Sequence, residues 1–309
     1  MLDGYEGAGK TFAALAIATH LSRGWGLPDA SGRPSGATGE PRATIYVAAE
    51  DGVGDTLRPR LERAGADLER IFVLEGYRDR SGAEGYFTLA DLRVLAGALD
   101  AVKPALLVLD PVFAFLDADG HKTKEVRPIL TRLAGLAAEY GTTMLLIRHM
   151  RKSATDRASH RGVGSVDFSA ACRSVVVLAE DPEDERRRVL AHAKSNLAPR
   201  GPSLTFLINE GQLEWAGLAG LSADELLESR EQRERRQPLV RGEAERFLRE
   251  FLGDGPKAQQ TVECEAKGVG ISVSTLRRAK QELGVRSRRV RGDDGYSWVW
   301  SLPEGRDDA

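Results

Sequence analysis

Residues 4–11 read GYEGAGKT, and this stretch near the start of the chain decides the fold. It matches the pattern G-x-x-x-x-G-K-[ST], in which glycines let successive backbone N–H groups turn inward around phosphates. The helix expected next, FAALAIATHLSR, would point the positive end of its dipole at the same anion. We expect Lys10 to reach the β and γ phosphates of a nucleotide and the Thr11 hydroxyl to bind Mg²⁺. The same Lys10–Thr11 pair excludes a Rossmann dehydrogenase, which would carry G-x-G-x-x-G.

The residues expected to contact the nucleotide are Gly4, Gly7, Ala8, Gly9, Lys10, Thr11 and Phe12. A phosphate loop of this kind should follow a buried strand, yet only three residues precede Gly4. We therefore expect the first strand to be missing or reduced to a stub, most simply because the chain is truncated or mis-started. The loop would then be poorly anchored, and one open alternative is a degenerate fragment that binds no nucleotide.

Two carboxylates are candidates for the chemistry of hydrolysis. Asp110 follows the apolar run 106–109, LLVL, and is expected to hold Mg²⁺ through water. Glu50 ends the strand expected from Thr44, where the carboxyl ends of parallel strands face the ligand crevice. We expect Glu50 to orient the attacking water, with its neighbour Asp51 as the alternative.

Short apolar runs alternate with helical stretches over the first two thirds of the chain. Continuous aliphatic runs predict buried strands at 44–49, 71–74, 105–109, 143–147 and 174–178, with helices near 10–23, 54–64, 89–100 and 124–139. This alternation predicts an α/β fold whose mostly parallel sheet is covered by helices on both faces. Strand-like segments at 188–193, 204–208 and 212–215 predict antiparallel strands at one edge of that sheet.

The length of 309 residues favours about two domains. We expect an ATPase domain over 1–216, a charged linker over 217–240 and a second domain over 241–303. No run of 18 apolar residues is present, and the first residues lack a secretory pattern, so we expect no membrane partner. The two cysteines, Cys172 and Cys264, have no Cys or His partners at metal spacing, which fits a reducing cytoplasm.

The order of several motifs carries a resemblance to a known family. The phosphate loop, AAED at 48–51, LLVLDP at 106–111, Arg148-His149, and RGVGSVDFSAACRSVVVL at 161–178 resemble RecA-fold ATPases. They are most similar to the RepA-type hexameric replicative helicases and related ATPases of plasmids, phages and mobile elements. The resemblance covers about residues 4–215.

The resemblance implies roles for particular residues. Glu50 would activate water, and His149 would sense the γ-phosphate and relay its state to DNA-binding loops; a plain loop histidine is the alternative for His149. Such ATPases form rings, here expected to be a homohexamer, in which a basic residue of the next subunit completes each site. We call this basic residue the finger. Arg173 occupies the position that resembles it in the family, and Arg161 and Lys194 are further candidates. Each of the three could instead be a surface charge.

Two polar loops would line the pore of such a ring and bind single-stranded DNA. Residues 119–124 follow the Asp110 strand, and residues 151–161 follow His149. Single-strand binding needs positive charge and usually aromatic side chains for stacking. These loops have the charge but, apart from His121 and His160, no ring to stack, which weakens the prediction.

The second domain shows a different chemistry. Expected helices near 257–267 and 273–284 are joined by a short glycine-containing turn, and an expected strand pair near 287–302 follows. Residues 277–291 hold seven basic residues against the single acid Glu282. This pattern resembles a winged helix-turn-helix that would bind duplex DNA, with Arg277, Arg278 and Lys280 on the recognition helix. A small protein-interaction domain is the alternative.

Together these features predict a Mg²⁺-dependent ATPase with a RecA-like core and a winged-helix domain. It would act in DNA replication or mobilisation of an extrachromosomal element. A DNA-binding regulator or loader, in which ATP controls assembly and no strands separate, is the alternative function.

Overall fold

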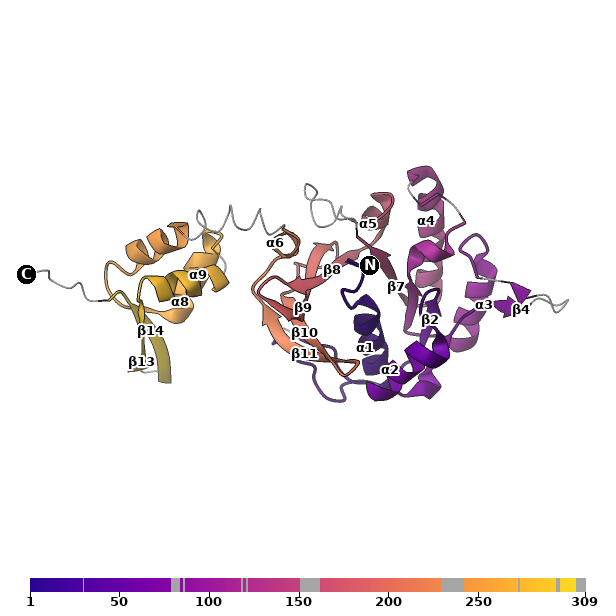
Figure 1. Cartoon of the computed structure of the whole chain (residues 1–309), viewed down its shortest axis with the longest axis horizontal. Coiled ribbons are helices and arrows are strands. Elements are labelled where there is room, and N and C mark those ends of the chain that lie inside the picture. The colour runs from indigo at the N-terminus through magenta and orange to yellow at the C-terminus, as the bar shows by residue number, and fades with distance from the viewer. Residues whose placement is uncertain are drawn as a thin grey trace, which may run out of the picture. The chain divides into compact units, whose positions relative to one another are not determined.

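The computed structural model divides the chain into two compact units, residues 1–227 and 228–309 (Figure 1). We call them unit 1 and unit 2 and describe each by itself. The structure describes residues 1–29, 31–78, 84–85, 87–117, 119–120, 122–150, 162–228, 242–271, 273–292 and 295–303. In that part of the chain, no helix is both long and apolar enough to cross a bilayer.

One sheet of nine strands organises the described part of unit 1. Its strands are β1 (Leu2–Gly4), β2 (Thr44–Ala48), β3 (Ile71–Val73), β6 (Leu106–Asp110), β7 (Thr143–His149), β8 (Ser174–Asp181), β9 (Asp184–Ser195), β10 (Ser203–Asn209) and β11 (Gln212–Ala219). Their order is β11-β10-β9-β8-β1-β7-β6-β2-β3. Neighbours from β8 to β3 are parallel, and those from β8 to β11 are antiparallel. The predicted mostly parallel α/β sheet with antiparallel edge strands is confirmed.

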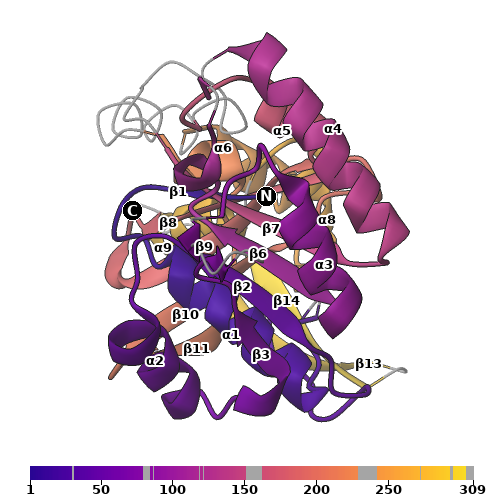
Figure 2. The same cartoon turned by 90° about the vertical axis from the view of Figure 1, so that its right-hand side faces the viewer.

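Helices cover both faces of this sheet (Figure 2). Helices α1 (Lys10–Arg23) and α2 (Arg58–Arg63) pack on one face, and α3 (Leu92–Val102) and α4 (Thr123–Glu139) on the other. Successive strand residues project to opposite faces, so Ile45 and Val47 join one core and Tyr46 the other. Continuous apolar strands are therefore required, because both faces are buried.

Strand β1 is short but firmly held between β7 and β8. Its Leu2 pairs with Ile147 of β7 on one side and with Val176 of β8 on the other. Asp3 accepts hydrogen bonds of 2.9 and 2.6 Å from the guanidinium of Arg148, and both side chains are buried. The expectation of a stub fits these three residues, but the expectation of a poorly anchored loop does not, because an internal ion pair ties the strand to β7.

Gly162 is required by the same ion pair. It forms a bridge with Met150 just beyond β7, and a Cβ at this position would overlap the guanidinium of Arg148. That guanidinium also donates to the Ser169 hydroxyl at 3.0 Å. The glycine of the RGVG stretch therefore leaves room for the arginine that anchors β1.

Several short elements were not expected from the sequence. They are the 3-10 turns η2 (Leu68–Arg70) and η3 (Val112–Phe115), the pair β4 (Tyr77–Arg78) and β5 (Glu84–Gly85), α5 (Asp167–Ala171) and α6 (Ala223–Leu226). The helix expected near 54–64 is divided into a π-helical turn η1 (Val53–Leu57) and α2. Helix α6 begins with a capping box formed by Ser222 and Glu225, and its Leu226 is buried in the core of unit 1. Residues 217–227, expected in a charged linker, therefore belong to unit 1, because α6 carries apolar side chains into that core. Residues 229–240 lie outside the described part of the chain.

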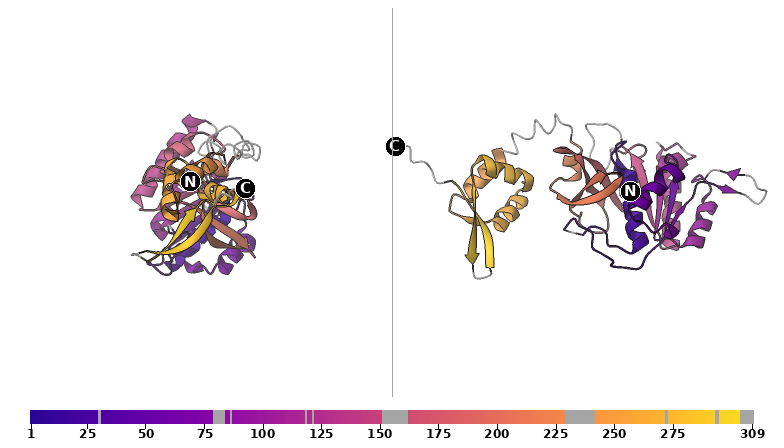
Figure 3. Two further views of the ribbon diagram at one scale, coloured as in Figure 1. Left: turned by 90° about the vertical axis from the view of Figure 1, so that its left-hand side faces the viewer. Right: turned by 60° about the horizontal axis from the view of Figure 1, so that its bottom comes forward.

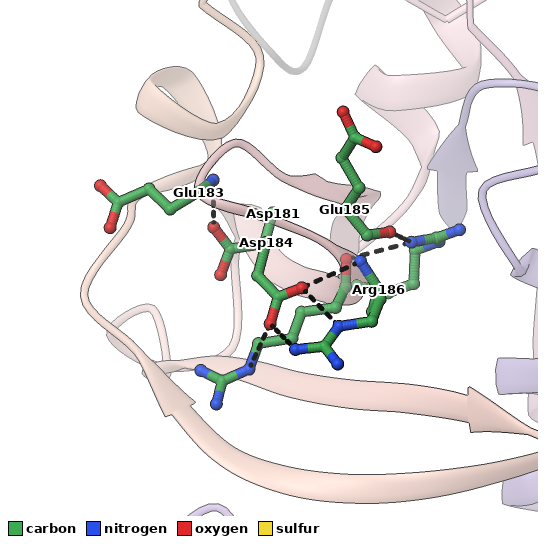
Figure 4. A network of polar contacts seen from close by, with 7 residues as sticks. Asp181, Glu183, Asp184, Glu185 and Arg186 are labelled. Atoms are coloured by element: carbon green, nitrogen blue, oxygen red, sulfur yellow. Dashed lines mark hydrogen bonds and ion pairs between the residues drawn. The ribbon is translucent and has the colours of Figure 1, made fainter.

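Strand β8 runs three residues past its predicted end, to a turn rich in charged groups (Figure 4). The Asp181 carboxylate accepts from the Glu183 amide at 2.9 Å, and Asp184 accepts from the amide and guanidinium of Arg186. An ion pair of 3.2 Å between Arg188 and Glu180 crosses from β9 to β8. These local polar contacts allow β8 and β9 to continue into solvent beyond the apolar run 174–178.

Unit 2 combines helices with a small sheet of order β12-β14-β13 (Figure 3). Its elements are a helix over 242–251, β12 (Lys257–Ala258), α8 (Gln259–Gly268), α9 (Val273–Glu282), β13 (Arg286–Gly292) and β14 (Gly295–Ser301). A separate core gathers Leu248, Val262, Leu276 and Trp300. The hairpin of β13 and β14 extends past the helices of this unit (Figures 1 and 3).

Candidate nucleotide-binding site

The phosphate loop connects β1 to α1 at the carboxyl end of β1. Gly7 and Gly9 have φ angles of 72° and 97°, in the left-handed region that side chains disfavour. A Cβ on Gly4 would lie 2.7 Å from the carbonyl oxygen of Leu178 in the neighbouring strand. No side chain caps the first turn of α1, whose N-cap is Gly9. The loop therefore leaves backbone N–H groups at a helix N-terminus for an anion.

Lys10 lies folded back over this loop. Its ammonium donates to the carbonyl oxygens of Gly4 at 3.1 Å and Tyr5 at 2.8 Å, and lies 3.4 Å from Nδ1 of His149. Burial lowers the pKa of Lys10, while the carboxylates of Asp110 and Glu50 act in the opposite direction. A buried ammonium with these partners is ready to bind the negative charge of a phosphate.

Asp110 lies at the carboxyl end of β6 and accepts two hydroxyl hydrogen bonds. Its Oδ2 accepts from Thr11 at 2.9 Å and from Tyr46 at 2.5 Å. Burial raises the pKa of Asp110, although the two hydroxyl bonds oppose that shift. Burial and the nearby Asp110 also raise the pKa of Tyr46. A hydroxyl and a carboxylate at this spacing are the hard oxygen ligands that suit Mg²⁺.

Tyr46 was missed by the sequence interpretation. It stands in the middle of β2, TIYVA, among apolar neighbours that are all buried. A buried tyrosine hydroxyl ordinarily finds a hydrogen-bond partner, so a tyrosine in such a run was the signal available. The sequence could have suggested Asp110, the acid that ends the neighbouring strand β6, as the partner of Tyr46.

Glu50 and His149 lie close to each other near the carboxyl ends of β2 and β7. His149 Nε2 lies 3.8 Å from Glu50 Oε1, while its Nδ1 faces Lys10. The Glu50 side chain is 65% exposed, so its carboxylate is accessible to water. His149 thus links the residue expected to bind phosphate with the residue expected to orient water.

Asp51 has a different partner. Its Oδ2 pairs with the guanidinium of Arg60 at 3.3 Å, and Arg60 in turn stacks over the ring of Phe12 at 4.4 Å. An acid held by an arginine is less suited to act on water than the neighbouring Glu50. This geometry favours Glu50 over Asp51.

The two described candidates for the finger, Lys194 and Arg173, are not part of this cluster. Lys194 donates to the carbonyl oxygens of Ser169, Ala170 and Cys172 at 2.7 to 3.0 Å, and so caps the end of α5 in its own chain. Arg173 is exposed and directly precedes β8, at the end of the sheet opposite the phosphate loop. Arg161 lies outside the described residues.

The loop over 119–124 is described only in part, and residues 151–161 lie outside the described part of the chain, with His160 among them. His121 is likewise outside it. Lys122 pairs with Asp119 at 3.5 Å and with Glu125 at 3.2 Å, and these acids raise its pKa. One expected DNA-binding charge is therefore neutralised within its own loop. Among the described residues no group of three or more His, Cys, Asp or Glu side chains could hold a metal.

Comparison with known proteins assigns this part of the chain to a family. A model of the family described as AAA domain matches residues 1–155, half of the chain. Among solved structures, the chain is similar to one described as the crystal structure of the RadB recombinase. The identity is 19% and the TM-score 0.46, over 69% of this chain and 89% of that one. A comparison with curated proteins gave no match. The family match includes the phosphate loop, Glu50, Asp110 and His149.

Proposed function

The chain belongs to the AAA domain family as a P-loop ATPase, and from this premise we propose that it couples Mg²⁺-dependent ATP hydrolysis to movement on DNA. The proposed role is that of a RepA-type replicative helicase of a plasmid, phage or mobile element. The observation that carries the proposal is the contact of His149 with both Lys10 and Glu50. It connects the phosphate-binding residue, the water-orienting acid and the strand β7 that leads toward the expected DNA loops.

The chain's own residues divide the chemistry among them. Backbone N–H groups of the loop and the Lys10 ammonium bind the phosphates, and Glu50 orients water from its exposed position at the end of β2. Thr11 and Asp110 would hold Mg²⁺, which supplies positive charge to the β and γ phosphates when it is bound. Tyr46 fixes the Asp110 carboxylate by donating to the same oxygen as Thr11.

In the described part of the site, no arginine lies beside Lys10. In a hexameric ring, a neighbouring subunit would supply this arginine. Arg173 is exposed and is located away from its own phosphate loop, as a residue that acts on a neighbour must be. The three carbonyl contacts of Lys194 argue against that residue for the same task. Arginine supplied to a neighbouring site stabilises the charge of the transition state.

Unit 2 is proposed to be a winged helix-turn-helix that binds duplex DNA. Leu276 and Ala279 of α9 are buried in the core, while Arg277 and Arg278 on the other side of the helix are exposed. A short turn joins α8 to α9, and the basic hairpin follows as the wing. Phosphate contacts from these arginines would place the helix on the duplex.

A regulator or loader that changes its assembly with ATP is the second candidate. The pairing of Lys122 with Asp119 and Glu125 favours it, because a translocating loop should offer charge to the strand. In this case ATP would control DNA binding by the ring without separation of strands.

One set of measurements tests the proposal. The purified chain is assayed for ATP hydrolysis with and without single-stranded DNA, for mass with and without ATP, and for opening of a forked duplex. A helicase should assemble with ATP, hydrolyse it faster on DNA and open the fork. Assembly with ATP but no opening of the fork would indicate the regulator or loader, and the absence of both hydrolysis and ATP-dependent assembly would exclude both functions.

A further inference from the structure

The β13–β14 hairpin of unit 2 carries aromatic and basic side chains on one face. Trp298 lies opposite Arg289, and Tyr296 lies opposite Arg291, in the register of the two strands. Directly opposed residues of antiparallel strands project to the same side, so these four side chains share a face. Trp300 projects to that face too, at the end of the hairpin where the helices cover it, and is only 1% exposed.

Beyond that buried end, the face is open to solvent. Trp298 is 52% exposed and Tyr296 is 63% exposed, and the hairpin extends past the helices (Figures 1 and 3). Large aromatic rings at this exposure mark a binding surface. The two strands carry four arginines and no acid; Asp293 and Asp294 come between them in the sequence. Such a density of positive charge beside the rings favours a polyanion as the partner.

Cations and rings alternate along this face. The guanidinium carbon of Arg289 lies 4.4 Å from the centre of the Tyr296 ring, diagonally across the strands. The Lys280 ammonium lies 4.4 Å from the centre of the Trp300 ring and donates to Ser287, which is opposite Trp300. These cation–π contacts hold positive charge beside the Tyr296 and Trp300 rings.

A pocket continues the same face at the base of the hairpin. Its volume is about 360 Å³, and Arg277, Lys280 and Trp300 are among the side chains that line it. Side chains of α9 and Trp300 of β14 therefore line one pocket at this end of the aromatic face. The resulting track runs from this pocket past Trp298 to Tyr296 near the tip.

We propose that this face binds single-stranded nucleic acid, with bases stacked on Trp298 and Tyr296 and phosphates beside Arg289 and Arg291. Proteins that bind single strands combine a basic path with aromatic platforms, and both are present here. A duplex keeps its bases stacked on one another, so it offers exposed rings little to stack on. The inference rests on the proposed function in taking DNA as the partner, but it assigns single strands to unit 2 as well as to the loops of unit 1.

The test uses the full chain without nucleotide and two labelled probes, a 20-nucleotide oligo(dT) and a blunt 20-base-pair duplex of mixed sequence. Fluorescence anisotropy gives the dissociation constants. Trp298→Ala and Tyr296→Ala should each weaken oligo(dT) binding by about 5- to 150-fold, the range for loss of one stacked base. Trp298→Phe and Tyr296→Phe keep a ring and should bind nearly as wild type. All four variants should leave the duplex constant unchanged.

Arg289 and Arg288 provide a matched control for charge. Both are exposed neighbours on β13 and lose the same charge on substitution, but only Arg289 lies on the aromatic face. Arg289→Ala should therefore weaken oligo(dT) binding more than Arg288→Ala. Thermal unfolding of each variant checks that the hairpin is intact.

The inference is overturned if the wild-type chain does not bind oligo(dT), if Trp298→Ala binds it as wild type, or if the variant loses duplex and single-strand binding equally. Equal losses would indicate a duplex-binding wing. The proposed ATPase function is tested separately by hydrolysis. If the chain has no ATPase activity but binds single strands in a way that depends on Trp298, the ATPase function is rejected and the single-strand site is supported.

Discussion

Arg148 and Asp3 form an ion pair inside the sheet, with Nη2 and Oδ2 2.6 Å apart and side chains 1% and 0% exposed. The pair joins β7 to the short strand that carries the phosphate loop. Three residues of strand offer few backbone hydrogen bonds, so much of the loop's position depends on this contact. Its strength is therefore linked both to folding and to nucleotide binding.

Breaking this pair from one side should be severely destabilising. Asp3→Ala leaves a buried, unpaired guanidinium and is expected to lower the free energy of unfolding by about 3–5 kcal/mol. Its ATP affinity should fall as well, because β1 positions Gly4. Chemical denaturation and nucleotide titration measure the two effects. The control is Arg58→Ala, which breaks an exposed pair with Glu62 and should cost no more than about 1 kcal/mol. Similar losses in the two variants would show that the buried pair does not anchor the strand.

Asp110→Asn should separate stability from function. Burial raises the pKa of Asp110 in the folded state, so the ionised carboxylate disfavours folding above that pKa. The neutral variant should therefore have a higher Tm than wild type at pH 7. The gain should shrink as the pH falls toward the ordinary Asp value of about 4, where the unfolded carboxyl is also protonated. Mg²⁺-dependent hydrolysis should be lost in the same variant. A lower Tm at pH 7 would show that the hydroxyl bonds outweigh burial.

Lys10 and Glu50 should differ in the step that each supports. Lys10→Ala removes the phosphate contact and should abolish hydrolysis and weaken ATP binding. Glu50→Gln should slow hydrolysis while ATP affinity remains close to wild type. Steady-state turnover and a fluorescent-nucleotide titration distinguish these outcomes. Asp51→Asn is the matched control, since Asp51 is paired with Arg60. Normal turnover in Glu50→Gln together with loss in Asp51→Asn would reassign the role to Asp51.

The sequence predicted the elements of this site better than the contacts inside it. Helix α1 begins at Lys10 and ends at Arg23, as the motif and the apolar pattern indicated. The sequence also predicted Asp110 beside the phosphate loop, because it ends a buried apolar strand, and its Oδ2 accepts from Thr11 of that loop. Local pattern is enough in such cases, because the signal lies within a few residues.

The contacts that sequence could not supply join distant segments. Asp3 meets Arg148 across 145 positions, and Tyr46 meets Asp110 across 64. Period and hydropathy show that a side chain is buried, but they do not show which buried partner satisfies it. The contacts of Lys194 could not be predicted for the same reason, because its three acceptors are backbone carbonyl groups, which no pattern of side chains indicates.

Mixed assemblies should identify the residue that acts on a neighbouring site. Arg173→Ala is expected to abolish hydrolysis while ATP affinity stays within a few-fold of wild type. Mixing it with Lys10→Ala should restore part of the activity, because one interface of a mixed ring combines an intact loop with an intact Arg173. Turnover measured across mixing ratios gives the result. Lys194→Ala, whose ammonium caps α5, should instead lower Tm. Absence of rescue for Arg173 with rescue for Lys194 would exchange the two assignments.

Duplex binding should depend on α9 and be separable from hydrolysis. Each phosphate contact contributes about −0.9 to the slope of log affinity against log salt, so Arg277→Ala with Arg278→Ala should flatten the slope by about 2. The control is Arg93→Ala with Arg186→Ala, two exposed arginines of unit 1 that should leave the slope unchanged. A chain ended after Glu228 should hydrolyse ATP yet lose this duplex binding, since the cores of the two units share no residue. Equal slopes in both double variants would show that α9 does not contact phosphates, and unit 2 would then be a protein-interaction module.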